Sequence, residues 1–336
     1  MIFLILDTYQ NHTKNLSRDL KLKIICSTVV RAAKQGDIHG GLYVVDIDSE
    51  EVLHYAPYEM DFVNDNERGG ERGLRGICVL SDRIIVSDSA GFTELDRETY
   101  QIKRTFQDRD HLKSVHEIVV HDDHIWATST AYDAIAKYDL DFNLKGFWQI
   151  LGKNVDDYKV LTGKKEITSE EKTEDDNFHI NSIFVSDGRI TFSGLITPLY
   201  DFETMEEVCE IPAFGRNNSK SFVHNFYKLD NVTIANLTTY NSIGISYTKR
   251  PQGVNGSVDF IPYPIPRAKN AKFIVDDIAS NNWNRGLAVS ENKFIIGSSP
   301  ARLLVFNSYT QEFEKEIVLE SDIRHAIHGL EILDEL

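Results

Sequence analysis

Residues 116–130 read HEIVVHDDHIWATST, and this pattern returns along the chain. A polar residue opens a short apolar strand, a polar turn follows, and a second strand ends in small or hydroxyl-bearing residues. The other copies are RGICVLSDRIIVSDS from Arg75, NSIFVSDGRITFSGL from Asn181, HNFYKLDNVTIANLT from His224, RGLAVSENKFIIGSS from Arg285 and HGLEILDEL from His328. Self-similarity at a regular spacing indicates a repeat architecture in which each copy is one structural unit.

Most copies continue with a third strand, a turn and a fourth strand, as in FTELDRETYQIKRTF from Phe92. Three of the five intervals between copies are about 41 to 43 residues, which matches the roughly 40–45-residue period of a four-stranded propeller blade. The two longer intervals imply insertions of about 20 residues beyond that period, near residues 153–177 and 249–284. The sequence therefore predicts an all-β protein, a six-bladed β-propeller with four-stranded antiparallel blades.

The sixth copy ends at Leu336, before its second strand. The segment KIICST, Lys23 to Thr28, reads like the missing strand, and GLYVVDIDSEEVLHY from Gly41 supplies the third and fourth strands. Pairing these N-terminal strands with the C-terminal strand closes the ring and leaves no exposed sheet edge. We therefore expect one propeller domain over residues 20–336, with residues 1–19 as an unassigned N-terminal segment.

The composition limits the partners of the protein. The 336 residues carry a formal charge of −16, which repels nucleic acid and anionic membranes at long range. The apolar opening, Met1 to Leu6, is far shorter than a membrane span and lacks the features of a signal peptide. We expect a cytoplasmic protein with neither a nucleic-acid nor a membrane partner, and the pattern leaves its oligomeric state open.

One face of the propeller should collect polar side chains. The start of a first strand and the end of a second strand lie at the same edge of an antiparallel sheet, as do the loops that lead into each blade. The ring of strand starts consists of Arg75, His116, Asn181, His224, Arg285 and His328. Around it we expect Ser129, Asn236 and Ser298 at second-strand ends, and Arg72 and His179 on loops.

Two arginines and three histidines in one ring concentrate positive charge on an acidic protein, which favours a small anionic ligand such as a carboxylate, sugar acid, sulfate ester or phosphate ester. The candidate substrate-binding residues are Arg72, Arg75, Ser129, Asn181, Asn236, Arg285 and Ser298. The alternative is that the side chains of the ring form hydrogen bonds only with channel waters and backbone carbonyls, and bind no ligand.

The histidines suggest two kinds of chemistry. His116, His224 and His328 fall on alternate blades, and three neutral imidazoles can hold a divalent metal, Zn, Mn, Fe or Ca, with a position open for water or substrate. His179 is then a fourth ligand or a base. Without a metal, one of these four histidines acts as general acid or base while arginines hold the substrate. Glu117 should point away from its neighbour His116, because side chains alternate along a strand.

Motifs over almost the whole chain support the repeat, among them STVVR at residues 27–31, RGGERGLRGI at 68–77, HEIVVH at 116–121 and AIHGLEIL at 326–333. In these motifs the chain resembles a group of uncharacterised bacterial proteins with a propeller fold, of the domain-of-unknown-function type. The resemblance implies the fold and brings no established activity. From the ring we expect an enzyme of lyase or hydrolase type. The alternative is a non-catalytic propeller that binds a ligand or another protein.

Overall fold

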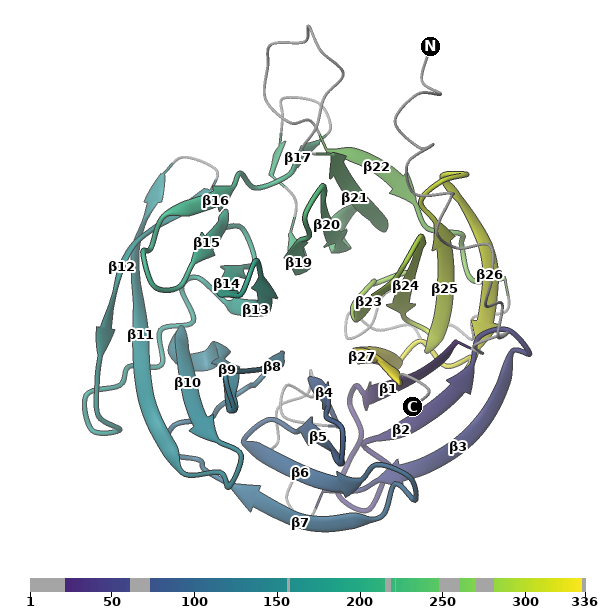
Figure 1. Ribbon diagram of the computed structural model, residues 1–336, viewed down its shortest axis with the longest axis horizontal. Helices are drawn as coiled ribbons and strands as arrows, with labels where there is room; N and C mark the ends of the chain where they lie inside the picture. The colour runs from purple at the N-terminus through teal and green to yellow at the C-terminus, as the bar shows by residue number, and fades with distance from the viewer. Residues whose placement is uncertain are drawn as a thin grey trace, which may run out of the picture.

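Six antiparallel sheets stand around a central channel in the computed structural model (Figure 1). The structure describes residues 22–60, 73–155, 158–214, 219–220, 222–247, 260–269 and 281–333. This arrangement confirms the predicted six-bladed β-propeller. The predicted N-terminal segment 1–19 and the candidate Arg72 lie outside the described residues.

The blades follow one another along the chain, each running from the channel outward. Blade 1 contains β4 (Ile77–Val79), β5 (Arg83–Ser87), β6 (Gly91–Asp96) and β7 (Ile102–Gln107). Blade 2 contains β8 (Ile118–His121), β9 (His124–Ser129), β10 (Ala134–Asp139), β11 (Leu144–Val155) and β12 (Tyr158–Glu166). Blade 3 contains β13 (Ile180–Ser186), β14 (Arg189–Gly194), β15 (Leu199–Asp201) and β16 (Glu207–Cys209).

The other three blades complete the ring. Blade 4 contains β19 (Val223–Lys228), β20 (Val232–Leu237), β21 (Ser242–Tyr247) and β22 (Ile261–Pro264). Blade 5 contains β23 (Leu287–Ser290), β24 (Lys293–Ser298), β25 (Arg302–Asn307) and β26 (Glu312–Val318). Blade 6 contains β27 (His325–Leu333), β1 (Lys23–Val30), β2 (Gly40–Asp46) and β3 (Glu51–Tyr58). A small hairpin, β17 (Ala213–Phe214) with β18 (Ser219–Lys220), lies between blades 3 and 4 in the chain.

Blade 6 joins the two ends of the chain, as the truncated repeat predicts. The C-terminal strand β27 pairs antiparallel with β1, with Ile332 opposite Ile24 and Ile327 opposite Thr28. In Figure 1 the yellow β27 lies on the channel side of the purple β1. This pairing covers the channel-side edge of β1, which therefore has a hydrogen-bonded neighbour on both sides.

The core lies between neighbouring blades. Middle strands such as β2 are buried along their whole length, whereas outer strands such as β7 alternate between exposed and half-buried residues. One cluster joins blades 1 and 2, where Phe92 meets Tyr138 edge-on with ring centroids 5.3 Å apart. This packing explains the continuous apolar runs in the middle strands, which face a neighbouring blade on both sides.

The insertion at residues 153–177 is not simply a surface loop. Its first part completes the long strand β11 and adds the fifth strand β12, with Ile150 opposite Lys164. Leu161 of β12 is buried in the core of blades 2 and 3. Of the second insertion, 249–284, the structure describes residues 260–269 and 281–284, which include β22.

A β-bulge marks the start of the inner strands. The register of the inner pair shifts by one residue in blades 3, 4 and 6, beside Asn181, Asn225 and His328. In blade 1 the backbone N–H of Arg75 donates to the oxygen of Ser87 while the N–H of Ser87 donates to the oxygen of Gly76, so two residues oppose one. A bulge bends its strand and changes the direction of its side chains.

Blade 5 has the same bulge as blade 1, and blade 2 has a bulge with different hydrogen bonds. Blade 5 repeats the two hydrogen bonds of blade 1 with Arg285, Gly286 and Gly297. In blade 2 the Oγ1 of Thr128 accepts from the backbone N–H groups of both His116 and Glu117, at 3.1 Å each. The bulge therefore sits at the ring position in every blade.

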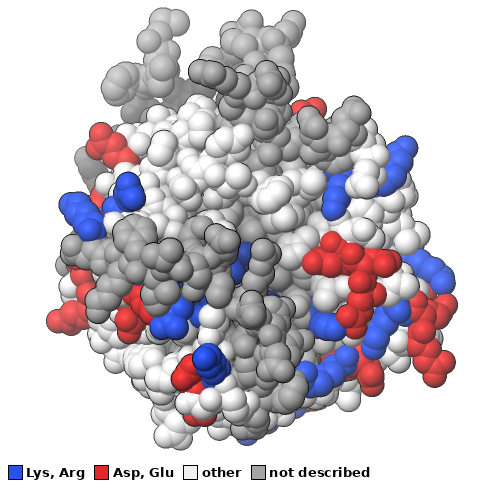
Figure 2. Space-filling view, turned by 180° about the vertical axis from the view of Figure 1, so that it is seen from behind, with Lys and Arg blue, Asp and Glu red and all other residues white. Residues whose placement is uncertain are grey.

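Figure 2 shows the face turned away from the viewer of Figure 1. Acidic and basic side chains are interspersed around its periphery, and the described residues form no broad basic patch there. No helix of the described chain is long and apolar enough to cross a membrane.

Candidate functional site

Four histidines meet in the channel. The ring centroid of His116 lies 4.9 Å from that of His179, 5.1 Å from that of His328 and 6.2 Å from that of His224. Three of them, His116, His179 and His224, each place one ring nitrogen within 4.8 Å of the others. These three residues, which we call the histidine group, are close enough to share one metal ion.

Each imidazole of the histidine group is held at Nδ1. The Nδ1 of His116 donates to the carbonyl oxygen of Ser114 at 2.8 Å, so this nitrogen carries the proton. The Nδ1 of His224 lies 2.9 Å from Oγ1 of Thr238, and that hydroxyl donates to the oxygen of Asn284. Since the hydroxyl proton is already committed, the threonine oxygen accepts from Nδ1–H.

His179 is held by two aspartates. Its Nδ1 lies 2.9 Å from the carboxylate of Asp176, which can only accept. The backbone N–H of His179 donates to Asp133 at 2.7 Å, and that of Phe178 donates to the other oxygen of Asp133 at 2.8 Å. Asp133 itself has left-handed backbone geometry, with φ of 47°.

The second nitrogen, Nε2, is left for a ligand in all three rings. Within the part of the chain that the structure describes, Nε2 of His116, His179 and His224 makes no hydrogen bond, and that of His224 is fully buried. Histidines that bind metals characteristically donate the other ring N–H to a carboxylate, carbonyl or hydroxyl, which fixes the tautomer and the ring direction. The histidine group has this arrangement before any metal is bound.

Blades 2 and 4 hold their histidines with the same short module. Thr130 opens the 3₁₀ turn η1 (Thr130–Tyr132), and Thr238 opens η2 (Thr238–Tyr240). Each hydroxyl contacts a histidine 14 residues earlier and donates to a backbone oxygen that leads into the next blade. The signal in the sequence is therefore a threonine at the end of the second strand.

Burial favours the neutral form of His116 and His224. Desolvation is the main cause that lowers the pKa of His116 and of His224, and nearby histidines and arginines lower both further. A neutral imidazole is the form that binds a metal through nitrogen. The lowered pKa values and the hydrogen bonds at Nδ1 therefore indicate the same state, a neutral imidazole with its proton on Nδ1.

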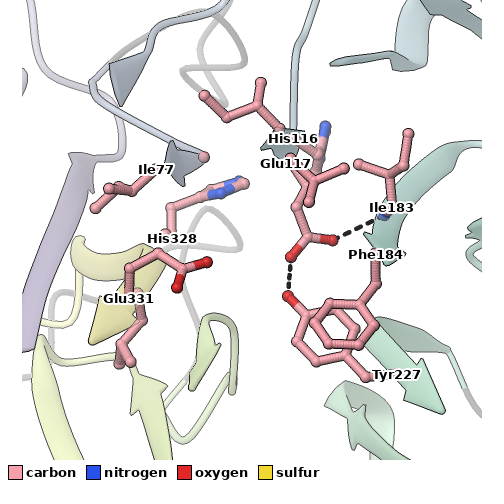
Figure 3. A pocket seen from close by; sticks show the side chains of 13 residues that line it. Ile77, His116, Glu117, Ile183, Phe184, Tyr227, His328 and Glu331 are labelled. Atoms are coloured by element: carbon pink, nitrogen blue, oxygen red, sulfur yellow. Dashed lines mark hydrogen bonds between the residues drawn. The ribbon is translucent and has the colours of Figure 1, made fainter. Parts of the chain in front are cut away.

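His328 differs from the predicted ligand set of His116, His224 and His328. It is only 5% exposed, and neither ring nitrogen has a hydrogen-bond partner in the described structure. The compact group contains His179 in its place. The ring of His328 instead faces the cavity deeper in the channel (Figure 3).

The arginines of the ring bring positive charge to the histidines. Arg75 is buried, and its Nη1 donates to the oxygen of Val115 at 2.9 Å. Arg285 is half-buried, and among the described residues its guanidinium makes no hydrogen bond or ion pair. Burial and the nearby Arg31 and Arg75 lower the pKa of Arg285, although a guanidinium keeps its proton in proteins. Its charge lacks the stabilising partner that an anion would supply.

The remaining candidates have structural hydrogen bonds. Asn236 donates to Asn225 and accepts from Asn284, both at 3.0 Å. Ser129 accepts from the backbone of Lys113, and the Ser298 hydroxyl donates to the Ser299 backbone oxygen. Asn181 donates to the oxygen of Val223 while its own Oδ1 is buried without a partner. Of these four side chains, only that of Asn181 has a free atom for a ligand among the described residues.

The expected direction of Glu117 is wrong. Glu117 lines the same cavity as His116 (Figure 3), because the bulge in blade 2 interrupts the alternation of side chains. Its carboxylate accepts from the N–H of Ile183 at 2.9 Å, from Nδ2 of Asn225 at 2.7 Å and from the hydroxyl of Tyr227. Burial raises the pKa of Glu117 to about 7.

Comparisons with known proteins identify no family for the chain. No family model matches the chain and no curated protein is significantly similar, which is consistent with the resemblance to an uncharacterised group. Solved structures with a similar fold include AztD from Citrobacter koseri, with 11% identity, a TM-score of 0.46, and coverage of 94% of this chain and 99% of that one. Streptogramin B lyase has 15% identity, a TM-score of 0.43, and coverage of 72% and 67%. The computationally designed Ika8 protein has 11% identity, a TM-score of 0.45, and coverage of 90% and 89%. At these values the likenesses carry no information about the site.

Proposed function

We propose that this propeller is a metal-dependent enzyme of hydrolase or lyase type that acts on a small anionic substrate at the channel mouth. The observation that carries the proposal is the histidine group, in which three imidazoles held at Nδ1 each place one ring nitrogen within 4.8 Å of the others. A purely structural histidine would be expected to use both nitrogens in hydrogen bonds within the protein.

Nitrogen ligands favour Zn²⁺ over Ca²⁺, which prefers oxygen. Three protein ligands leave one position of a tetrahedral ion for water or substrate, which is the arrangement of catalytic rather than structural zinc sites. A metal bound there would polarise a carbonyl or phosphoryl oxygen and lower the pKa of its water. Arg285 would hold the anionic group beside it.

The test is activity of the purified protein after removal and return of the metal. Chelator-treated protein should be inactive on a panel of phosphate esters, sulfate esters and lactones, and Zn²⁺ should restore turnover of at least one class. Zinc binding without turnover of any class would point to a non-catalytic ligand-binding propeller. Turnover that survives complete removal of metal would point to histidine acid/base chemistry.

The variant Arg285→Gln tests the anionic substrate. A lost charge-assisted hydrogen bond costs roughly 1.5–3 kcal/mol, so KM should rise about 10- to 100-fold with a smaller change in kcat. The matched control is Arg189→Gln, since Arg189 begins β14 of blade 3 with an exposed side chain. An unchanged KM in Arg285→Gln would contradict the anionic substrate.

A further inference from the structure

The histidine group occupies one half of the channel ring. His116 stands just before β8 of blade 2, His179 just before β13 of blade 3, and His224 in β19 of blade 4. These three blades are neighbours around the channel (Figure 1). A tetrahedral metal held by this group has its protein ligands on one side, so its remaining position faces the other half of the ring.

The other half of the ring carries hydrogen-bond donors. Arg285 precedes β23 of blade 5, His328 lies in β27 of blade 6, and Arg75 precedes β4 of blade 1. The guanidinium of Arg285 makes no hydrogen bond or ion pair with the described residues. A ligand in the remaining position of the metal would therefore lie against this half of the ring.

The imidazole of His328 indicates a ligand independently of Arg285. Its side chain is 5% exposed, and neither ring nitrogen has a hydrogen-bond partner in the described structure. Burial lowers the pKa of His328 and favours the neutral imidazole, which has one N–H donor and one bare nitrogen. Because buried polar groups in folded proteins nearly always have a partner, this N–H points to one that the described chain does not supply.

The position of His328 fits contact with a ligand of the metal rather than with the metal itself. Its ring centroid lies 5.1 Å from that of His116, yet His328 is not a member of the histidine group. In Figure 3 its ring reaches from β27 toward His116. Metal–nitrogen bonds are about 2.0–2.1 Å long, and a hydrogen bond from a metal-bound oxygen adds about 2.7–3.2 Å. A residue that binds such an oxygen lies one layer outside the metal ligands, as His328 does.

The directions of these groups favour a tetrahedral oxyanion. The metal would approach from blades 2 to 4, Arg285 from blade 5 and His328 from blade 6. A carboxylate has two oxygens on one side of its carbon, whereas a phosphoryl or sulfuryl group presents three oxygens around its ester bond. One oxygen can bind the metal, one can bind Arg285, and the third can accept a charge-assisted hydrogen bond from His328. A water in the cavity that His328 lines can serve its second nitrogen.

We propose that His328 is a substrate-binding residue that selects a phosphate or sulfate ester, by donating a hydrogen bond to the oxygen that neither the metal nor Arg285 holds. The inference rests on the proposed function for the metal and for the anion at Arg285. It adds the residue that distinguishes a tetrahedral oxyanion from a carboxylate.

The experiment measures the binding of methylphosphonate and of acetate to the zinc-loaded protein by calorimetry. Each probe has one methyl group, and they differ in having three or two oxygens. The wild type should bind methylphosphonate at least tenfold more tightly. In His328→Phe the affinity for methylphosphonate should fall about 10- to 100-fold, the loss of one charge-assisted hydrogen bond, and that for acetate by less than about threefold. Since a neutral imidazole and a phenyl ring carry the same charge, the larger charge of methylphosphonate does not by itself produce this difference.

A second variant and a control accompany His328→Phe. His328→Gln keeps a side-chain N–H donor and should recover most of the affinity for methylphosphonate. The control is His124→Phe, because His124 begins β9 at the opposite edge of blade 2 from the ring. Zinc affinity should be that of the wild type in all three variants, since none of them removes a residue of the histidine group.

The possible failures are distinguishable. Equal losses for the two probes in His328→Phe, or no loss for either, would overturn the role of His328 and leave the metal and the anion site in place. Loss of zinc from both His328 variants would make His328 a metal ligand instead. Failure of the wild type to bind zinc would remove the proposed function together with this inference.

Discussion

Single hydrogen bonds determine which nitrogen each histidine offers to a ligand. The hydroxyl of Thr238 accepts from Nδ1 of His224 because its own proton goes to the oxygen of Asn284. The carboxylate of Asp176 accepts from Nδ1 of His179. In each case the nitrogen left free is Nε2. The geometry of the site is therefore set by residues that do not touch the ligand.

Thr238→Val should weaken zinc binding about 10- to 100-fold, because it removes the oxygen that orients His224 while keeping the side-chain shape. Thr238→Ser retains the hydroxyl and should restore most of the affinity. Both are measured by zinc titration against a competing chelator. Equal zinc affinity in the valine and serine variants would show that this hydroxyl does not orient the ring.

Stability should fall as the pH falls through the histidine range. Burial lowers the pKa of His116, His224 and His328 below 6.5, so below that value the unfolded chain binds more protons than the folded one. Each histidine contributes up to about 1.4 kcal/mol per pH unit. Glu117 acts in the opposite direction, since its raised pKa of about 7 makes the folded state bind the extra proton between about pH 4.5 and 7.

The measurement is the melting temperature of metal-free protein between pH 5.5 and 7.5, for the wild type and for His328→Gln. The wild type should lose stability toward pH 5.5, and the variant should lose less. A variant with the same pH dependence as the wild type would show that His328 is not buried in its neutral form.

At the scale of elements, the bulges decide which side chains face the channel. Alternation along a regular strand would separate His116 from Glu117, whereas the bulge brings both to one cavity. The same position is glycine in three blades, at Gly76, Gly286 and Gly329, where the inner strands approach closely. A Cβ added to Gly329 would overlap the carbonyl oxygen of Arg75.

The added strand β12 should be part of the stable fold rather than a dispensable loop. Leu161→Ala should lower the free energy of unfolding by about 2–4 kcal/mol, because Leu161 is 4% exposed in the core of blades 2 and 3. Lys165→Ala on the same strand should change it by less than about 0.5 kcal/mol, since its side chain is exposed. Urea denaturation of both variants makes the comparison, and an equally small effect of Leu161→Ala would show that β12 packs loosely.

At the scale of the whole molecule, six similar blades surround one channel, and only a few of the channel residues belong to the histidine group. The six copies, the closing strand and the polar ring could be predicted from the sequence, because strand periodicity and the repeat can be recognised without knowledge of side-chain contacts. That His179 rather than His328 completes the histidine group could not, since it depends on a loop that Asp133 of blade 2 holds through the backbone N–H groups of Phe178 and His179. The direction of Glu117 could not either, because a bulge is not visible in the alternation pattern.

Closure of the ring makes a prediction for the whole molecule. A chain that ends at residue 324 lacks β27 and should aggregate, because β1 then has an unpaired edge. A permuted chain that carries residues 325–333 ahead of residue 22, through a short turn, should fold and bind zinc, since Leu333 lies opposite Lys23. Soluble, cooperatively unfolding protein from the truncated chain would contradict the role of this closure.

The most direct test is zinc calorimetry on chelator-stripped protein. We predict one zinc ion per chain, with an affinity that falls in His116→Ala, His179→Ala and His224→Ala by more than the roughly 10- to 100-fold expected for Thr238→Val. His111→Ala, at a histidine bonded to Asp108 outside the histidine group, is the control and should bind as the wild type does. Absence of saturable zinc binding, or wild-type affinity in His179→Ala, would contradict the account.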